Sequence, residues 1–403
     1  MTDTVGNRLE LASRRSHHLS VPPDIHHALR ALPIFRTSHH RAALRPMIGI
    51  RLTPPRKVFV SLTGDFTNIG DAVIRRQSLA WARKMGEIRA YVGGAPEEWF
   101  PSVGLMVDDH VVRTKANVRH WISDLIRSRR PVFVFDPGEV PLDHGNFRRE
   151  VVYLALTLLV RAKRGYVVRP PRAVARPTRV NLALHRLASR ASQVCLWRTR
   201  EDAARLRTGR PSPDIGFSMA TRVGSVAATR TVLAVSLRWD RPMPEDPWFQ
   251  AVRDFAADNG FSIEVVSQVY GDVARSRDVA ARLNASHDDW SGKHDLAHEA
   301  FVREVYDRSR IVISDRLHVL VVAATSGVVP AQLIPNPVPK VAANFRAVGY
   351  EQMTLNSSIS TIPEMADFLS AQLTRHDELD TAFSAAGREL ETIERQFLAD
   401  ASL

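Results

Sequence analysis

The chain has very little cysteine: Cys195 is its only one. A single thiol cannot form an intrachain disulfide or a cysteine-based zinc site, so the composition fits a reducing compartment and we expect a cytoplasmic protein. The amino-terminal sequence MTDTVGNRLELASRR lacks the apolar segment of a signal peptide. The longest apolar run, residues 151–160, is too short to span a bilayer, and we expect a buried helix there.

Lysine is also scarce. Six of the 55 basic residues are lysines, which leaves 49 arginines, a bias that a GC-rich coding sequence also produces. The net charge of +12 favours anionic partners: a phosphorylated substrate, an acidic glycan, a membrane surface or nucleic acid. The hydrophobic content of 44% and charged content of 24% are typical of a soluble globular protein.

With 403 residues, the chain is long enough for two domains of ordinary size. The first stretch, 1–54, is rich in Arg, His and Pro and predicts a flexible basic arm. Its three pairs of adjacent histidines lack a framework of carboxylates or cysteines, so we expect no metal site there. Alternating strand and helix patterns predict an amino-terminal domain at 55–220 and a carboxy-terminal domain at 228–345, joined by a linker near 215–230. Residues 346–403 are predicted to be helices that pack back across both domains.

The stretch from residue 57 to residue 84 reads as a strand, a loop and a helix, which is how a Rossmann-like unit begins. Its loop has neither the G-x-G-x-x-G pattern nor a Walker lysine. The loop instead offers Asp65, Asn68 and Asp71 near a helix amino terminus, groups that suit the recognition of hydroxyls. The alternative is purely local: Asp71 as the N-cap, Gly70 as the turn and Asn68 in an Asx-turn.

A second strand-to-helix junction lies at residues 311–335. The apolar strand at 311–313 ends at Ser314-Asp315-Arg316, and Leu317-His318 opens an Ala-rich helix that runs to residue 324. Polar groups at such a junction lie where open α/β sheets bind ligands. Arg316 and His318 are therefore candidates for anion binding and proton transfer, although a structural arginine and a capping histidine would give the same spacing.

Three further polar residues follow predicted strands. Arg198 follows the strand at 194–197, Arg238 ends the strand at 232–238, and Gln268 follows the strand at 262–267. Because the carboxyl ends of parallel strands share one edge of a sheet, we expect these side chains to face a common cleft. For Arg198, a structural role between the domains is an equal alternative.

Asn68-x-Gly70-Asp71 after the first strand, and Ser314-Asp315-Arg316-Leu317-His318 followed by Gly-x-x-Pro, resemble the two recurrent motifs of the polysaccharide pyruvyl transferase family. The resemblance extends from about residue 57 to about residue 350. The sequence departs from the family pattern in three places. Thr199 replaces an aspartate, residues 136–139 replace a glycine-rich turn, and 169–173 stand where the family has a short Gly/Pro loop.

This resemblance implies an α/β fold with two Rossmann-like domains facing a cleft, the glycosyltransferase-B architecture. It also implies transfer of a pyruvyl group from phosphoenolpyruvate to a saccharide as a ketal. We expect no metal and no further cofactor, because arginines can balance the anionic charge of the donor. His318 would be the general acid, and Arg316 would hold the donor anion. Asp65, Asp71 or Asp315 would orient or deprotonate the acceptor, with Asp71 counted among the catalytic residues. The remaining substrate-binding candidates are Arg198, Arg238, Asn68, Gly70, Ser314, Leu317 and Gln268.

The expected partners are phosphoenolpyruvate and a saccharide acceptor, with peripheral contact to membrane-linked glycan precursors. Two alternatives remain. A basic cleft of the same architecture serves a nucleotide-sugar glycosyltransferase equally well. A nucleic-acid-binding protein would also explain the charge, but the sequence has no zinc finger or aromatic–basic RNA motif, and its arginines are dispersed among carboxylates, so we expect no nucleic acid.

Overall fold

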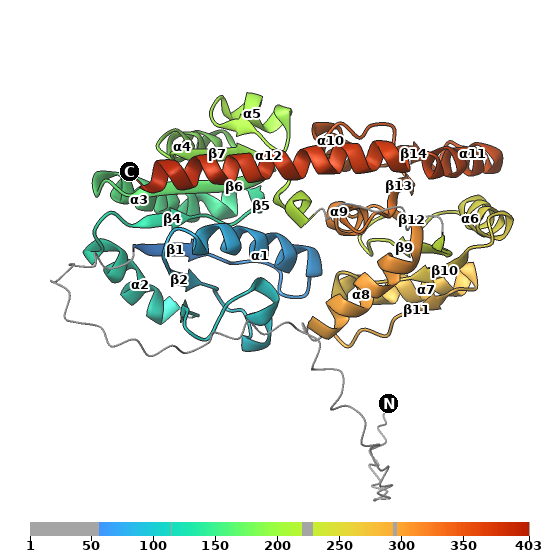
Figure 1. Ribbon diagram of the computed structural model, residues 1–403, viewed down its shortest axis with the longest axis horizontal. Helices are drawn as coiled ribbons and strands as arrows, with labels where there is room; N and C mark the ends of the chain where they lie inside the picture. The colour runs from blue at the N-terminus through green and yellow to red at the C-terminus, as the bar shows by residue number, and fades with distance from the viewer. Residues whose placement is uncertain (1–55, 114, 220–228, 293–295, 403) are drawn as a thin grey trace, which may run out of the picture. The chain divides into compact units, whose positions relative to one another are not determined.

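The computed structural model describes residues 56–113, 115–219, 229–292 and 296–402 (Figure 1). The predicted arm at 1–54 and residues 220–228 of the predicted linker lie outside the described residues. The described chain is built on two parallel β-sheets with helices on their faces.

The first sheet has eight strands in the order β3-β2-β1-β4-β6-β7-β8, with β5 pairing with β6, and every pairing is parallel. Val58, Phe59 and Val60 of β1 are fully buried, as expected for a strand covered on both faces. The strands are β1 (Lys57–Ser61), β2 (Glu87–Tyr91), β3 (His110–Val112), β4 (Val132–Val134), β5 (Gly138–Pro141), β6 (Tyr166–Ala175), β7 (Val194–Trp197) and β8 (Arg210–Pro211).

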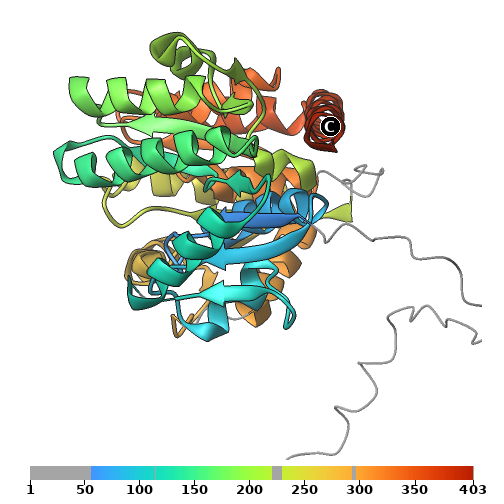
Figure 2. The same cartoon turned by 90° about the vertical axis from the view of Figure 1, so that its left-hand side faces the viewer.

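Helices cover both faces of this sheet. They are α1 (Ile69–Arg83), α2 (Lys115–Arg127), α3 (Phe147–Ala162), α4 (Arg179–Arg190) and α5 (Arg200–Leu206). α1 packs on the face that presents Val58 and Val60, whereas α2 and α3 pack on the opposite face against Phe59 and Phe133 (Figure 2). The chain leaves β1 toward β2 on one side and continues through β4 on the other, which places a topological switch point between β1 and β4.

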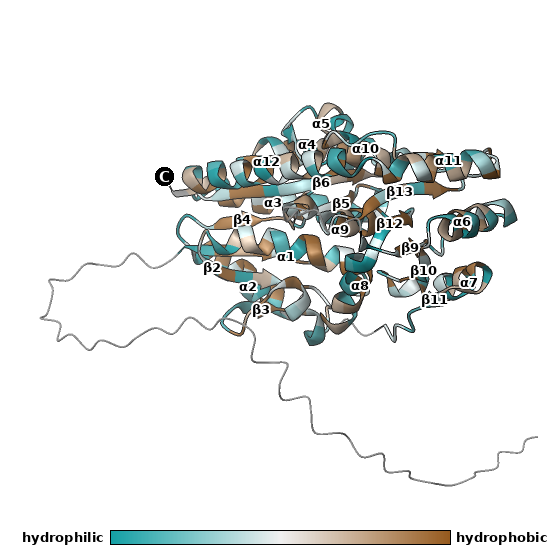
Figure 3. Ribbon diagram, turned by 45° about the vertical axis from the view of Figure 1, so that its right-hand side comes forward, coloured by the Kyte–Doolittle hydropathy of each residue, from teal (hydrophilic) through white to brown (hydrophobic). Residues whose placement is uncertain are grey.

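The second sheet has six parallel strands in the order β11-β10-β9-β12-β13-β14, with its switch point between β9 and β12. Its strands are β9 (Val232–Ser236), β10 (Ser262–Val265), β11 (Ser286–His287), β12 (Ser309–Ser314), β13 (Val329–Ile334) and β14 (Thr354–Asn356). Its helices are α6 (Asp246–Asp258), α7 (Val273–Leu283), α8 (Leu296–Arg308), α9 (Leu317–Thr325) and α10 (Pro339–Ala347). The hydrophobic colouring of β9, α9 and β13 is visible in Figure 3.

The chain ends with α11 (Ile362–Leu373) and α12 (His376–Ser402). α12 returns to the face of the first sheet that carries α1 (Figure 1). The rings of Phe397 and Trp81 lie 5.4 Å apart, and Lys84 Nζ lies 2.8 Å from Glu394 Oε1. No helix among the described residues is long and apolar enough to cross a membrane.

Three predictions of local structure were wrong. The region after Phe345 is not helical throughout, because Leu355 of β14 pairs with Leu333 of β13. Residues 169–173 are not a loop: they continue β6, whose register with β7 shifts between Arg169 and Arg172, which accommodates two prolines that cannot donate to the ladder. Residues 151–160 are helical, but only one face of α3 is buried.

Candidate active site

A pocket of about 170 Å³ opens where the carboxyl ends of the first sheet's strands meet those of the second. Eight of the twelve predicted site residues line it, from elements of both sheets. The lining residues are Asn68, Asp71, Glu139, Arg198, Arg238, Gln268, Val269, Arg316, Leu317, His318, Val319 and Lys340. Both sequence motifs therefore contribute side chains to one pocket.

The amino terminus of α1 is fixed to the second sheet by backbone hydrogen bonds. The N–H of Ile69 donates to the carbonyl of Gln268 at 2.9 Å, and the N–H of Tyr270 donates to the carbonyl of Thr67 at 2.9 Å. Asn68 is the N-cap of α1, and its side-chain oxygen accepts from the N–H of Asp71 at 3.3 Å. The Asn68 motif thus holds the two sheets together at the pocket, and Asp71 is free of the capping role.

Gly70 and His318 lie in close contact between α1 and α9. A Cβ atom on Gly70 would be 2.5 Å from the Cβ of His318 and 3.1 Å from its Nδ1. No side chain fits in that space, so glycine is required for α1 to approach α9 this closely. Gly70 acts on the pocket by placing His318, and does not itself line it.

His318 Nε2 lies beside a buried ion pair. Arg198 Nη1 donates to Asp214 Oδ2 at 2.6 Å, and both side chains are 1% exposed. His318 Nε2 is 3.3 Å from Arg198 Nη1 and 3.4 Å from Asp214 Oδ2. Burial raises the pKa of Asp214, but the charges of Arg198 and His318 and the N–H of Gly216 outweigh it and hold that pKa well below its usual range.

This arrangement can serve either protonation state of the imidazole. A neutral Nε2 accepts a hydrogen bond from Arg198, whereas a protonated Nε2 donates to the ionised Asp214. His318 can therefore gain and release a proton without losing its place, as a general acid or base requires. The same contacts show that Arg198 is both a structural residue and part of the pocket wall.

Asp71 is ionised, and a backbone N–H and a guanidinium group hold its carboxylate. Its Oδ2 accepts from the N–H of Asp65 at 3.0 Å and lies 3.3 Å from Arg75 Nη1. Burial pushes its pKa up, yet Arg75, the N–H of Asp65, His318 and Arg198 together lower it. A carboxylate with a lowered pKa is a weak general base, so Asp71 is better suited to accept a hydrogen bond from a substrate hydroxyl.

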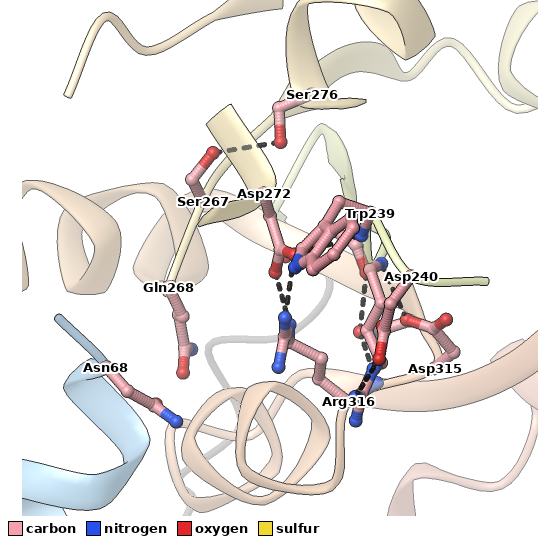
Figure 4. A network of polar contacts seen from close by, with 12 residues as sticks. Asn68, Trp239, Asp240, Ser267, Gln268, Asp272, Ser276, Asp315 and Arg316 are labelled. Carbon is pink, nitrogen blue, oxygen red and sulfur yellow. Dashed lines mark hydrogen bonds and ion pairs between the residues drawn. The ribbon is translucent and has the colours of Figure 1, made fainter. Parts of the chain in front are cut away.

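Arg316 and Arg238 point their guanidinium groups at carboxylates. Figure 4 shows Arg316 directed at Asp272. Arg316 pairs through Nε and Nη2 with Asp272, which is fully buried, and the Nη2–Oδ1 distance is 2.7 Å. Arg238 pairs through Nε and Nη2 with Asp240 at 2.8 and 2.7 Å. These bidentate pairs fix both arginines on the pocket wall before any ligand binds.

Besides Gly70, three predicted residues lie outside the pocket, and each has structural partners. Asp65 accepts from the N–H and hydroxyl of Thr67. Ser314 Oγ donates to the carbonyl of Ser236 and accepts from the N–H of Arg316. Asp315 is buried and accepts from the N–H of Arg238 at 3.0 Å, and burial raises its pKa to about 6. Ser314 and Asp315 join β12 to β9 and so place Arg316 and Arg238.

Sequence reasoning missed Asp214, Glu139 and Lys340. Asp214 stands at the edge of the predicted linker near 215–230, and only its contacts with Arg198 and His318 reveal its role. Glu139 of β5 forms an ion pair with Lys340 at the start of α10, across the pocket wall. Lys340 is one of only six lysines, which is the one signal that the sequence offered.

Gln268 also contributes an orphaned group. Its Nε2 donates to the hydroxyl of Tyr306 at 2.7 Å, while its Oε1 is buried without a partner among the described residues. Figure 4 shows its side chain between Asn68 and Arg316. Within the described ranges, no group of three or more His, Cys, Asp or Glu side chains is placed to hold a metal ion.

Comparisons with known proteins identify the fold. No protein-family model matches the sequence, and no curated protein matches it. Among solved structures, the chain is similar to UDP-GlcNAc 2-epimerase from Neisseria meningitidis bound to UDP-GlcNAc, at 12% identity and a TM-score of 0.50, covering 84% of this chain and 100% of that one. It is also similar to HepE from Anabaena in complex with UDP, at 12% identity and a TM-score of 0.51, covering 86% of this chain and 99% of that one.

The expected fold class is confirmed: the chain is an α/β protein of glycosyltransferase-B-like architecture, with two Rossmann-like domains facing a cleft. At 12% identity the similarity concerns the fold alone. The residue boundaries of the two domains stay predictions.

Proposed function

We propose that this protein is a transferase that moves a pyruvyl group from phosphoenolpyruvate to a saccharide. The observation that carries the proposal is the convergence of Asn68, Asp71, Arg198, Arg316 and His318 on one pocket. These residues belong to the two motifs that resemble pyruvyl transferases and to the strand end between them. The proposal includes no metal or further cofactor.

The pocket's cations and size favour a small anionic donor. Arg198, Arg238, Arg316 and Lys340 line it, and they are paired with Asp214, Asp240, Asp272 and Glu139, respectively. The guanidinium N–H groups that these carboxylates leave unoccupied can bind the phosphate and carboxylate of phosphoenolpyruvate. A volume of about 170 Å³ is below the roughly 300–1,000 Å³ usual for pockets that hold drug-sized ligands. A nucleoside diphosphate sugar would extend beyond this pocket, whereas phosphoenolpyruvate would not.

The reaction transfers protons between groups, but it neither consumes nor releases protons overall. Two sugar hydroxyls form bonds to C2 of phosphoenolpyruvate, C3 gains a proton and becomes a methyl group, and the bond from C2 to the phosphate oxygen breaks. One of the two hydroxyl protons reprotonates the acid that protonated C3, and the other leaves on the phosphate. His318 is the proposed acid toward C3, Asp214 positions it, and Asp71 accepts a hydrogen bond from an acceptor hydroxyl.

A nucleotide-sugar glycosyltransferase is the second candidate. The similar Neisseria and Anabaena structures hold UDP-GlcNAc and UDP, and this supports a saccharide partner more directly than it supports phosphoenolpyruvate. In that case Arg198 and Arg316 would bind a diphosphate. The second candidate differs from the first in its donor, and the donor can be tested without knowing the acceptor.

The deciding experiment measures binding and turnover in parallel. We expect phosphoenolpyruvate to raise the melting temperature of the purified protein, and UDP and UDP-sugars to leave it unchanged. Addition of pooled bacterial glycans should then release phosphate in the wild type but not in His318→Ala. Stabilisation by UDP-sugars alone, with no phosphate release from phosphoenolpyruvate, would replace the first candidate with the second.

A further inference from the structure

Helix α4 buries polar side chains and exposes apolar ones, while its Leu182 packs against the buried Cys195, Trp197 and Leu206. Its buried residues are Asn181, His185, Ala188 and Ser189, of which three are polar. Val180 and Leu187 on its outer side are 58% and 52% exposed. Surface helices normally bury their apolar side chains, so the exposure of both Val180 and Leu187 on one helix is unusual.

The polar residues on the buried side of α4 form hydrogen bonds, and these bonds fix the orientation of the helix. His185 Nδ1 lies 2.7 Å from Glu150 Oε2, with both side chains fully buried. The side-chain amide of Asn181 donates to the carbonyls of Leu142 and Asp143. Rotation that buried Val180 and Leu187 would break these contacts and would remove the hydrogen bond between His185 and the buried Glu150, which would keep its pair with Arg149.

The neighbouring helix α3 is apolar on its outer side as well. α3 packs against α4, and Figure 2 shows the two helices together on the side of the sheet away from α12. Val151, Val152 and Leu158 of α3 are 42%, 48% and 52% exposed. We name the exposed apolar residues of these two helices the α3–α4 face: Phe147, Val151, Val152, Leu158, Val180 and Leu187. Exposed apolar side chains grouped on two packed helices are characteristic of an interaction site.

The exposed charges that α3 and α4 themselves carry have one sign. Arg148 and Arg161 of α3, and Arg179 and Arg190 of α4, are exposed near the helix ends. Within the sequences of these two helices the one carboxylate is Glu150, which is buried against His185. The surface therefore combines apolar side chains with exposed arginines and offers no exposed carboxylate of its own.

From this combination we propose that the α3–α4 face binds the surface of an anionic phospholipid bilayer. Apolar side chains of an interfacial helix enter the boundary between headgroups and acyl chains, while arginines reach the phosphates. The proposal does not depend on the donor or on the reaction at the pocket.

Other occupants of the face fit its charge less well. In a two-fold symmetric dimer, the same patch meets itself, which would bring the arginine rims of two copies together. Residues 1–55 are no better suited, since they contain eight arginines against three carboxylates. A bilayer that carries negative headgroups is the partner that satisfies both the apolar centre and the basic rim.

The test is flotation of the full chain with phosphatidylcholine vesicles, with and without phosphatidylglycerol. We expect binding to the anionic vesicles only, weaker at high salt because the arginines act through screened charge. The double variant Leu158→Ser, Leu187→Ser should reduce binding about tenfold or more, because two apolar side chains no longer enter the bilayer. Replacing Arg161 and Arg190 by Gln should weaken binding and reduce its dependence on salt.

The matched control is Val107→Ser, Ile359→Ser, which removes two exposed aliphatic side chains from other parts of the surface. It should float like the wild type, and all variants should keep the wild-type melting temperature because the substituted residues are exposed. Three results would overturn the proposal: no flotation of the wild type, equal loss in the control, or a dimer that Leu158→Ser, Leu187→Ser abolishes while flotation is unchanged.

Discussion

The Cβ of His318 occupies the position that a side chain on Gly70 would need, with 2.5 Å between it and an ideal Gly70 Cβ. The amino terminus of α1 and the start of α9 therefore meet where Gly70 has no side chain. This contact joins the two sequence motifs directly and sets the place of the imidazole beside Arg198 and Asp214.

Gly70→Ala is expected to reduce both activity and stability. The added methyl group meets a Cβ rather than the flexible end of a side chain, so α1 or α9 must shift, at a cost of about 1–3 kcal/mol. The control is Gly387→Ala in α12, where the new Cβ would have its nearest neighbour at 3.9 Å. That variant should be neutral or more stable, by up to about 1 kcal/mol, because alanine favours a helix. The measurements are melting curves and turnover rates. Equal effects of Gly70→Ala and Gly387→Ala would contradict the close contact between Gly70 and His318.

His318→Ala is expected to lower kcat by about a hundredfold or more, because a general acid is lost, while the donor still binds. The measurements are phosphate release and a donor titration followed by calorimetry. His110→Ala, which removes an exposed histidine from β3, should leave both unchanged. Normal turnover per folded molecule in His318→Ala would show that the histidine is only structural.

Arg316→Lys is expected to weaken donor binding and also to destabilise the fold. Lysine keeps the charge but loses the planar fork that pairs with Asp272, which is fully buried. A double-mutant cycle with Asp272→Asn should give a coupling free energy above about 1 kcal/mol. Arg277→Lys, at an exposed pair with Asp289, is the control and should change neither quantity. If Arg316→Lys binds the donor normally, the arginine serves the fold alone.

The stability of the protein should depend on Asp315 between about pH 4 and pH 6. Burial, opposed by the N–H of Arg238, raises the folded-state pKa of Asp315 to about 6, above its ordinary 3.8. As pH rises, the unfolded state releases this proton first, so the free energy of unfolding falls through that window, by about 3 kcal/mol. Asp315→Asn cannot ionise and should lack this fall.

The measurement compares melting temperatures at pH 4.5 and pH 7.5. Relative to the wild type, Asp315→Asn should be more stable at pH 7.5 and should lose most of that advantage at pH 4.5. Asp246→Asn, at a highly exposed carboxylate, controls for the general effect of pH. A constant difference between Asp315→Asn and the wild type at both pH values would contradict the raised pKa.

The sequence alone determined most of the α/β pattern. Apolar runs such as residues 311–313 predicted buried parallel strands, and the polar groups that follow them marked the edge where ligands bind. That reasoning located Arg198, Arg238, Gln268 and Arg316, because the end of a strand is a local property of the chain. The same reasoning failed for residues 151–160. The apolar run predicted burial, whereas the polar contacts of α4 with the adjacent face of α3 leave much of the run exposed.

Only the tertiary structure decided which groups meet. Asp214 lies 104 residues from His318, and Arg316 lies 44 residues from its partner Asp272. No local pattern specifies such pairs, because their distances depend on how the two sheets twist and how closely α1 approaches α9. Those same distances determine whether an arginine on the pocket wall pairs with a carboxylate. They also determine which aspartate stays ionised beside the histidine.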